Sequence, residues 1–352
     1  MSSPFLTLNP RPSQRPVAVT TTAAVAPQRV LIVNTNGGGH ANIGFWLAKT
    51  LAAQGHSVTI NVVGSQDDAK MQKPPFSYFS ELTSAGVTTC WANPEELATK
   101  AAGQSFDVVV DNNGKDLDTV GPVADFAVSA GAKQFLFVSS AGMYVPTDTP
   151  PHLEGDAVKE SAGHAKVEAM LKTKPFAMSS FRPQYFTGYG NNKDCEEWFF
   201  DRLVRGRPVP IPGSGDQLSV VAHAEDVATM MAAAVGCDAA AGQIFNAVTN
   251  RAVTLNGMVK ICAAAAGVEP NIVNYDPDTL PEGVAVKKAF PFRPIHFYSH
   301  PKNALELLDW KPTHTLETDM KERFAFYQQS GRGGKDMAFE MDDAILASAK
   351  RY

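Results

Sequence analysis

Two acidic segments of the sequence carry side chains that could hold a divalent cation. The first contributes Asp111, Asp116 and Asp118, and the second contributes Asp194, Glu196 and Glu197. Clustered carboxylates bind Mg²⁺ and position a water molecule for hydrolysis of a phosphodiester. If both segments border one cleft, Asp111, Asp116 and Asp194 are candidate catalytic and Mg²⁺-binding groups, although the sequence alone identifies no nuclease centre.

Local roles compete with this metal-binding role. Asp118 has the position of a helix N-cap, and Asp194 with Glu197 has the spacing of a capping box, which would use both side chains locally. His164 is a candidate acid–base for attack by a ribose 2′-hydroxyl. A single histidine on an amphipathic helix is equally explained by packing or solvation.

A glycine-rich turn indicates a second kind of chemistry, which is phosphate binding. An unbroken apolar run at residues 30–33 leads into glycines 37–39, and apolar side chains then recur at helical spacing up to residue 51. The order of strand, glycine turn and helix opens a dinucleotide-binding unit, in which backbone amides receive a phosphate. We predict a phosphate-cradling loop at Gly38, Gly39 and Gly44, either for an RNA phosphate or as a vestige of dinucleotide binding.

The dinucleotide fingerprint is incomplete. With the spacing G-x-x-G-x-x-G, the middle glycine is replaced by Ala41, and Val62 lies where an acidic residue would hold a ribose hydroxyl. Binding of NAD(P) is therefore doubtful.

The order of motifs between residues 29 and 310 resembles that of sugar-nucleotide epimerases, and includes RPQYFTGYG at 182–190 and GRPVPIPGSG at 206–215. Those enzymes use a serine after the fifth strand and a Tyr-x-x-x-Lys pair, whose lysine lowers the pKa of the tyrosine. Ser139 and Ser140 fit the serine position and Lys166 fits the lysine, but Ala162 stands in place of the tyrosine. Tyr144 follows the fifth strand and could reach the cleft, but it does not lie where the Tyr-x-x-x-Lys pattern puts the catalytic tyrosine. Redox and epimerase chemistry are therefore disfavoured.

Cationic and aromatic side chains near the expected cleft could contact RNA. The candidates for phosphate contacts are Lys115, Lys166, Arg182 and Lys193, and those for base stacking are Tyr144, Tyr185 and Tyr189. Core packing is the alternative for Tyr185. Arg202, Arg205 and Arg207 could extend the basic surface or simply form a solvated helix face.

The elements that position these residues alternate between strand and helix. Strands are predicted at 30–33, 58–63, 87–91, 106–110, 134–140, 176–181 and 244–248, and helices at 43–51, from 118, at 154–172, 194–205, 225–235, 254–266 and 316–324. Residues 208–215 are predicted to be a tight turn. This pattern predicts an α/β fold, a Rossmann-like doubly wound parallel sheet with a smaller C-terminal lobe, of the extended short-chain dehydrogenase/epimerase type.

Four regions follow from this pattern. Residues 1–28 are rich in Ser, Thr and Pro and contain no acidic residue, so they are expected to be a transit peptide or a disordered leader. Residues 29–182 form the nucleotide-binding domain, 183–330 form a smaller lobe interleaved with the end of the sheet, and 331–352 form a tail with a short helix.

Composition narrows the class of protein. The 352 residues carry a net charge of −5, with 44% hydrophobic and 19% charged residues, as in ordinary globular proteins. RNA binding would therefore depend on a local basic patch. The four cysteines form no C-x-x-C pair, and no apolar run is long enough for a membrane span.

Four longer segments are more specific than the glycine fingerprint. DNNGKDLDT at 111–119, PPHLEGD at 150–156, GNNKDCEEWFFDR at 190–202 and FEMDD at 339–343 are closely similar to the chloroplast stem-loop-binding protein family, in its a-type branch. The resemblance implies a protein of the chloroplast stroma that binds stem-loop mRNA and rRNA. It further implies Mg²⁺-dependent endoribonuclease activity, association with ribosomal particles and a sister b-type protein, and a homo- or hetero-oligomer.

Three functions remain open from the sequence. The leading hypothesis is a plastid RNA-binding protein with weak stem-loop endoribonuclease activity. The second is a ribosome assembly or RNA-stabilising factor that is not an enzyme. The third is an NAD(P)-dependent sugar-nucleotide epimerase or reductase with an unusual acid–base.

Overall fold

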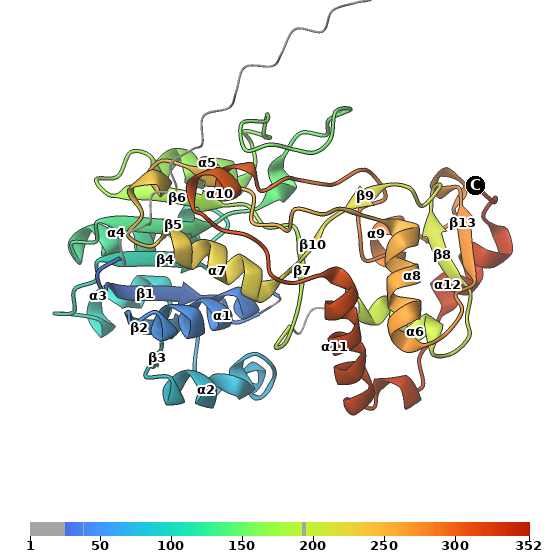
Figure 1. Cartoon of the computed structure of the whole chain (residues 1–352), viewed down its shortest axis with the longest axis horizontal. Helices are drawn as coiled ribbons and strands as arrows, with labels where there is room; N and C mark the ends of the chain where they lie inside the picture. Colours follow the sequence, from blue (N-terminus) through green and yellow to red (C-terminus); the bar gives the residue numbers. More distant parts are fainter. Residues whose placement is uncertain (1–24, 38, 192–194) are drawn as a thin grey trace, which may run out of the picture.

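A seven-stranded parallel sheet forms the centre of the fold in the computed structural model, which describes residues 25–37, 39–191 and 195–352 (Figure 1). The strands follow the spatial order β11-β6-β5-β4-β1-β2-β3. Their bounds are β1 (Arg29–Asn34), β2 (Ser57–Val62), β3 (Thr88–Trp91), β4 (Val108–Asn112), β5 (Gln134–Val138), β6 (Ala177–Phe181) and β11 (Ile244–Phe245). The chain winds outward from β1 in both directions, so the predicted doubly wound fold is confirmed.

Both faces of the sheet are covered, which explains the unbroken apolar strands. Val30 and Ile32 of β1 pack into one hydrophobic cluster, whereas Leu31 and Val33 pack into another on the opposite face. The first cluster includes side chains of α1 (His40–Ala53), α2 (Phe79–Ser84), α7 (Ala224–Ala234) and α10 (Lys302–Leu307). The second includes α3 (Leu97–Lys100), α4 (Leu117–Ser129) and α5 (Gly163–Leu171).

A smaller lobe lies beside the sheet and has its own core (Figure 1). Its helices are α6 (Glu197–Leu203), α8 (Leu255–Ala266), α9 (Val286–Ala289), α11 (Leu316–Gln329) and α12 (Glu340–Ser348). Three strand pairs accompany them. These are β7 (Tyr185–Thr187) with β10 (Val221–His223), β8 (Val209–Pro212) with β13 (Ile272–Tyr275), and β9 (Leu218–Ser219) with β12 (Val253–Thr254).

The prediction of a tight turn at 208–215 holds only for residues 213–214 and was wrong for the residues before them. Residues 209–212 form β8, which pairs in parallel with β13 from Val209↔Ile272 to Pro212↔Tyr275. Val209 and Ile211 are fully buried in the lobe core. The alternating prolines made the segment look like a turn, but prolines are tolerated on a strand that pairs along one edge.

Two predicted helices are shorter than expected. The helix predicted from residue 154 begins at Gly163, because Glu154 turns inward and accepts hydrogen bonds from the backbone amides of Asn246 and Asn303, both at 3.2 Å. The helix predicted over 194–205 is described only from Glu197 to Leu203.

The N-cap of α4 is Asp116 and not Asp118. The Asp116 carboxylate accepts a 3.0 Å hydrogen bond from the Thr119 amide and bonds the Thr119 hydroxyl at 2.7 Å. Asp118 is an exposed residue of the first turn, where a negative charge still favours the helix dipole.

The three arginines at 202–207 do not form a solvated face, since each binds another part of the chain. Arg202 pairs with the buried Asp342 of α12 at 2.8 Å, and Arg207 pairs with Asp343. Arg205 donates to the carbonyl of Lys335 at 2.7 Å. The C-terminal segment is thereby clamped to α6, and these guanidinium groups are not free for RNA.

Removal of the buried carboxylate should test this clamp. The change Asp342→Ala leaves the guanidinium of Arg202 buried without its partner, so we expect the free energy of unfolding to fall by about 3 kcal/mol in a urea titration. The matched change Asp343→Ala removes a carboxylate that is 63% exposed and should cost less than about 1 kcal/mol. Equal losses from the two changes would refute the clamp.

Candidate functional site

The start of α1 is fixed at the carboxyl edge of the sheet by two buried asparagines. The side-chain amide of Asn112, at the end of β4, donates to Asn34 Oδ1 and to the carbonyl of His40, both at 2.7 Å. Asn34, at the end of β1, in turn donates to the Ala41 carbonyl at 3.3 Å. These bonds place the first turn of α1 over the carboxyl ends of β1 and β4, where open parallel sheets bind ligands.

Two of the predicted phosphate-loop glycines are required by close contacts. A Cβ at Gly39 would lie 2.6 Å from the ring of Phe186, and a Cβ at Gly44 would lie 2.1 Å from Asn34 Oδ1. Gly39 is also the N-cap of α1, so its neighbours include helix amides that lack intrahelical acceptors. Gly38 lies outside the described residues.

Several buried polar atoms along this edge have no hydrogen-bond partner in the part of the chain that the structure describes. They belong to Asn42 (both side-chain atoms), Asp111 (Oδ2), Asn112 (Oδ1) and Ser139 (Oγ). Buried polar atoms are normally hydrogen-bonded, so such a group marks a place for water or a polar ligand. The edge therefore suits a polar ligand chemically.

Asp111 serves the turn after β4. Its Oδ1 accepts hydrogen bonds from the amides of Asn113 at 2.9 Å and Gly114 at 2.7 Å, and the side chain is fully buried. Burial raises the pKa of Asp111 to about 6, and the two backbone hydrogen bonds oppose this rise only in part.

The predicted rim residues meet where the β4–α4 turn packs against α5. A Cβ at Gly163 would lie 2.3 Å from the carbonyl oxygen of Lys115, which shows how closely the two segments approach. Lys115 and Lys166 are both exposed, and neither forms an ion pair with any described residue. His164 is half-buried, and this burial lowers its pKa. Lys115 follows β4, and His164 and Lys166 lie near the start of α5, so all three belong to the two segments that meet beside the edge.

Arg182 and Tyr144 are buried, which contradicts their predicted roles in RNA contact. Arg182 is 3% exposed and binds Glu168 through two hydrogen bonds of 3.1 and 2.7 Å. Tyr144 is 2% exposed, stacks on His152 and donates to Asn246 Oδ1 at 2.8 Å. Burial raises the pKa of Tyr144 to about 12, so it is also a poor substitute for the missing tyrosine.

The other two tyrosines pack within the protein. Tyr185 contacts Phe292 edge-on and accepts a hydrogen bond from the Arg293 amide, as the core-packing alternative predicted. Tyr189 stacks on Tyr78, with ring centroids 4.7 Å apart, and donates to Glu81.

The second acidic segment is engaged by Arg323 of α11. Glu196 is fully buried and accepts from Arg323 Nε at 2.6 Å and from the Thr187 hydroxyl at 2.9 Å, while Glu197 pairs with the same guanidinium. These carboxylates hold the lobe together. Lys193 and Asp194 lie outside the described residues.

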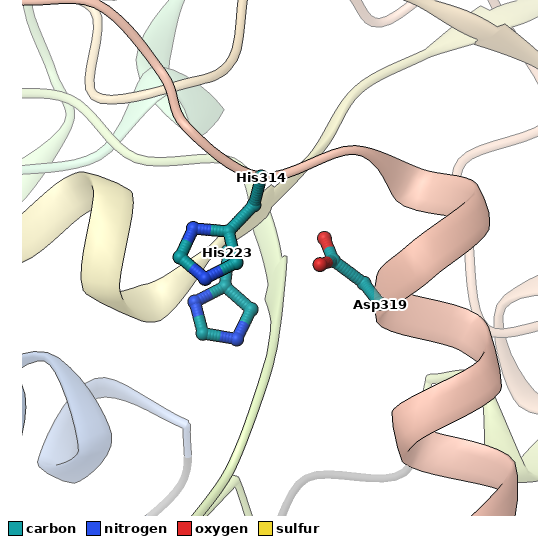
Figure 2. A group of neighbouring side chains, drawn as sticks. All are labelled: His223, His314 and Asp319. Carbon is teal, nitrogen blue, oxygen red and sulfur yellow. The ribbon is translucent and has the colours of Figure 1, made fainter.

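A group that sequence reasoning missed lies where α7 meets α11 (Figure 2). His223, His314 and Asp319 have potential ligand atoms within 4.8 Å of one another. They form the only such group of three in the described ranges, which contain no comparable cluster around Asp111 or Asp116. His223 is far in the sequence from His314 and Asp319, and the three residues share no motif spacing, so no sequence signal could have found them.

The ring geometry of this group does not favour a shared metal ion. The imidazoles of His223 and His314 are stacked, with centroids 3.7 Å apart and planes 7° apart, so their nitrogen lone pairs run parallel and do not converge. Mg²⁺ moreover prefers oxygen ligands. The described residues therefore do not fit a preformed Mg²⁺ site.

The pKa values of all three residues in this group are shifted from their ordinary values. Burial and the neighbouring His314 lower the pKa of His223 to about 4, while burial raises that of Asp319 to about 7. For His314, burial acts downward, but the 3.0 Å contact with Asp226 outweighs it, so the pKa is raised. Burial thus disfavours the charged form of His223, whereas the contact with Asp226 favours the charged form of His314.

Comparison with known proteins now assigns the family. Residues 37–247 match the NAD dependent epimerase/dehydratase family. Over 333 residues, which cover 92% of this chain and 86% of the relative, the sequence is 35% identical to the "chloroplast stem-loop binding protein of 41 kDa b, chloroplastic" of Arabidopsis thaliana. The chain belongs to the chloroplast stem-loop-binding protein family. The family resemblance is confirmed, whereas the a-type assignment stays a prediction, because this relative is the b-type protein.

Solved structures support the fold of this stem-loop-binding family member. A UDP-glucose 4-epimerase from Stenotrophomonas maltophila superposes with a TM-score of 0.66 and 17% identity, covering 88% of this chain and 100% of that one. The epimerase Mth375 from Methanothermobacter thermautotrophicus gives a TM-score of 0.64 and 15% identity, with 88% and 94% coverage. The predicted epimerase-type fold is thereby confirmed.

In this family member, the residues that would serve a nicotinamide cofactor are altered. Ala162 is the N-cap of α5, and Val62, at the end of β2, is fully buried. Neither side chain can exchange a proton or bind a ribose hydroxyl. In the described part of the chain, no helix has the length and apolar character needed to cross a membrane.

A pH titration of stability should reveal the buried Asp111. The pKa of about 6 in the folded protein exceeds the ordinary value of 3.8, so stability present at low pH is lost as the pH rises through 6. Asp111→Asn keeps an acceptor oxygen for the two backbone amides but cannot ionise, so the variant should not lose this stability as the pH rises. Relative to the parent, the variant should gain up to about 3 kcal/mol between pH 4 and pH 7 in denaturant titrations.

The exposed Asp118 provides the control for this titration. Asp118→Asn should not reproduce the gain expected for Asp111→Asn. If Asp111→Asn gives no gain either, then Asp111 is not the buried group described here.

Proposed function

We propose that this protein binds structured RNA in the chloroplast through the phosphate-cradling start of α1 and the neighbouring lysine rim. The observation that carries the proposal is that the sheet edge keeps the phosphate-binding turn while the proton-exchanging tyrosine is replaced by Ala162. The relative at 35% identity, whose name states both stem-loop binding and the chloroplast, supports the ligand and the location.

Phosphate binding at this edge would use two sources of positive potential. The first is the N-terminus of α1, where backbone amides and the helix dipole favour an anion. The second is the pair of exposed lysines, Lys115 and Lys166, on the facing turn and helix. Contacts of this kind position a strand without reading its sequence, which suits recognition of RNA shape.

Redox chemistry is the weaker alternative. A sugar-nucleotide epimerase needs an ionisable phenol near the nicotinamide, and the phenol of Tyr144 is sealed by its bond to Asn246. The acidic partner of the ribose is also absent at Val62. We therefore propose that the edge no longer serves NAD(P).

Cleavage of stem-loops with Mg²⁺ is the finer part of the proposal. Asp111 and Asp116 bond backbone amides, and Glu196 and Glu197 bond Arg323. Because each of these carboxylates already uses at least one oxygen within the protein, we propose no cleavage step that runs through them. A non-enzymatic assembly or RNA-stabilising factor is accordingly the second candidate.

The family also indicates where such binding would operate. We propose the chloroplast stroma as the compartment. The proposed partners are ribosomal particles, mRNA, rRNA and the b-type protein, and the protein itself would form a homo- or hetero-oligomer. The net charge of −5 means that attraction to RNA depends on the local rim.

Loss of the two rim lysines should weaken RNA binding. We expect Lys115→Ala/Lys166→Ala to reduce the affinity for a plastid stem-loop about tenfold. The slope of log affinity against log salt concentration should become shallower by about two, because two phosphate contacts are lost. Mobility-shift titrations at several salt concentrations measure both quantities. The control Lys260→Ala/Lys288→Ala removes two exposed lysines of the other lobe, and an equal loss there would point to a diffuse charge effect.

Calorimetry separates the RNA-binding function from the redox alternative. Neither NAD⁺ nor NADP⁺ should bind with micromolar affinity, since the ribose-binding acid and the phenol are missing. Micromolar binding of either cofactor would reinstate the epimerase hypothesis.

Removal of divalent metal separates the nuclease from the assembly factor. Incubation of a labelled stem-loop with the protein and Mg²⁺ should yield fragments that a chelator abolishes if the nuclease proposal is correct. If the RNA stays intact and bound in the presence of Mg²⁺, the nuclease proposal is rejected and the assembly-factor function is supported.

A further inference from the structure

A cavity of about 400 Å³ lies apart from the sheet edge, between two segments that each lead into a helix. Residues 249–253 lead into α8, and residues 311–317 lead into α11. The cavity borders the junction in Figure 2, because His314 lines it from the segment that enters α11. Its volume lies within the range of sites that hold small molecules.

Positive charge predominates in the lining of this cavity. Arg251 and Lys311 are both exposed, and within the described residues neither takes part in an ion pair. His314 also lines the cavity, but its two ring nitrogens already face Asp226 at 3.0 Å and Glu225 at 3.6 Å. Glu317 is the one opposing carboxylate in the lining. Long side chains with unsatisfied cationic heads at the mouth of a cavity suit an anion.

The start of α11 adds backbone donors at the same place. Thr315 caps this helix by accepting from the Thr318 amide at 3.3 Å, and the Asp319 amide bonds the Thr315 carbonyl at 2.9 Å. The amides of Leu316 and Glu317 precede the first intrahelical bonds and belong to residues that line the cavity. Such amides supplement the cations in binding a phosphate.

An apolar wall completes the cavity. Val253, Ile261 and Leu316 contribute hydrophobic surface beside the charged groups. A ligand with a phosphate at one end and a flat, weakly polar ring at the other would match both parts. A nucleotide is the common chemical group with this character.

We propose that this cavity is a second ligand site, which binds one phosphate-bearing nucleotide, either free or as part of an RNA strand. The phosphate lies against Arg251 and Lys311, and the base lies against the apolar wall. For a free nucleotide the site is independent of the RNA-binding function proposed above, and only its RNA form rests on that function.

The location of the site links it to the junction between α7 and α11. His314 stacks on His223, and its Nδ1 lies 3.0 Å from Asp226 in the first turn of α7. A ligand that binds only the folded protein should raise the temperature of thermal unfolding by mass action.

Calorimetry of the full chain with AMP, with inorganic phosphate and with a short unpaired RNA tests the site. We expect AMP to bind with a Kd of about 1 mM or lower and phosphate to bind more weakly, since phosphate lacks the base. The double change Arg251→Gln/Lys311→Gln should weaken AMP at least tenfold. Lys321→Gln, an exposed residue of α11 outside the lining, is the matched control.

The outcomes separate the two sources of nucleotide from failure of the proposal. AMP binding that the double change abolishes establishes a free-nucleotide site. RNA binding without AMP binding, lost in the double variant but retained in Lys115→Ala/Lys166→Ala, establishes a site for a strand. If neither ligand binds, or if the double change weakens neither, the cavity is not a nucleotide site, and this result leaves RNA binding at the sheet edge unaffected.

Discussion

The contact between Asn112 and Asn34 is the constraint on which the rest of the site depends. One buried amide group bonds both the neighbouring strand and the carbonyl of His40, so the direction in which α1 leaves the sheet is fixed by polar bonds. Hydrogen bonds in such a dry environment are costly to break, because a lost partner leaves a buried polar atom unsatisfied. The positions of the helix amides and of Gly39 follow from this arrangement.

The fold retains the geometry of a nucleotide-binding enzyme while its ionisable groups have changed roles. Tyr144 and Arg182 are structural, since each is sealed in the interior by a specific partner. Glu196 binds Arg323 across the lobe. Charges that could have served catalysis thus stabilise the packing, and the groups left free, such as Lys115 and Lys166, are suited to binding a polyanion.

The sequence was sufficient for the fold and for part of the site. Unbroken apolar runs predicted the parallel strands because both faces of the sheet are buried, and the glycine turn predicted the start of α1. The prolines of β8 misled because their pairing partner, β13, lies about sixty residues away in the chain. The burial of Arg182 and Tyr144 could not be predicted, since their partners Glu168 and Asn246 carry no motif. The stacked histidines are likewise a consequence of tertiary packing alone.

The clamp between α6 and α12 has a consequence for the order of folding. Arg202 and Asp342 are separated by 140 residues along the chain. During synthesis, α6 is complete long before α12 emerges, so the guanidinium of Arg202 must wait for its buried partner. The smaller lobe can therefore close only after Asp342 has been synthesised, whereas the strands of the central sheet all come from earlier segments.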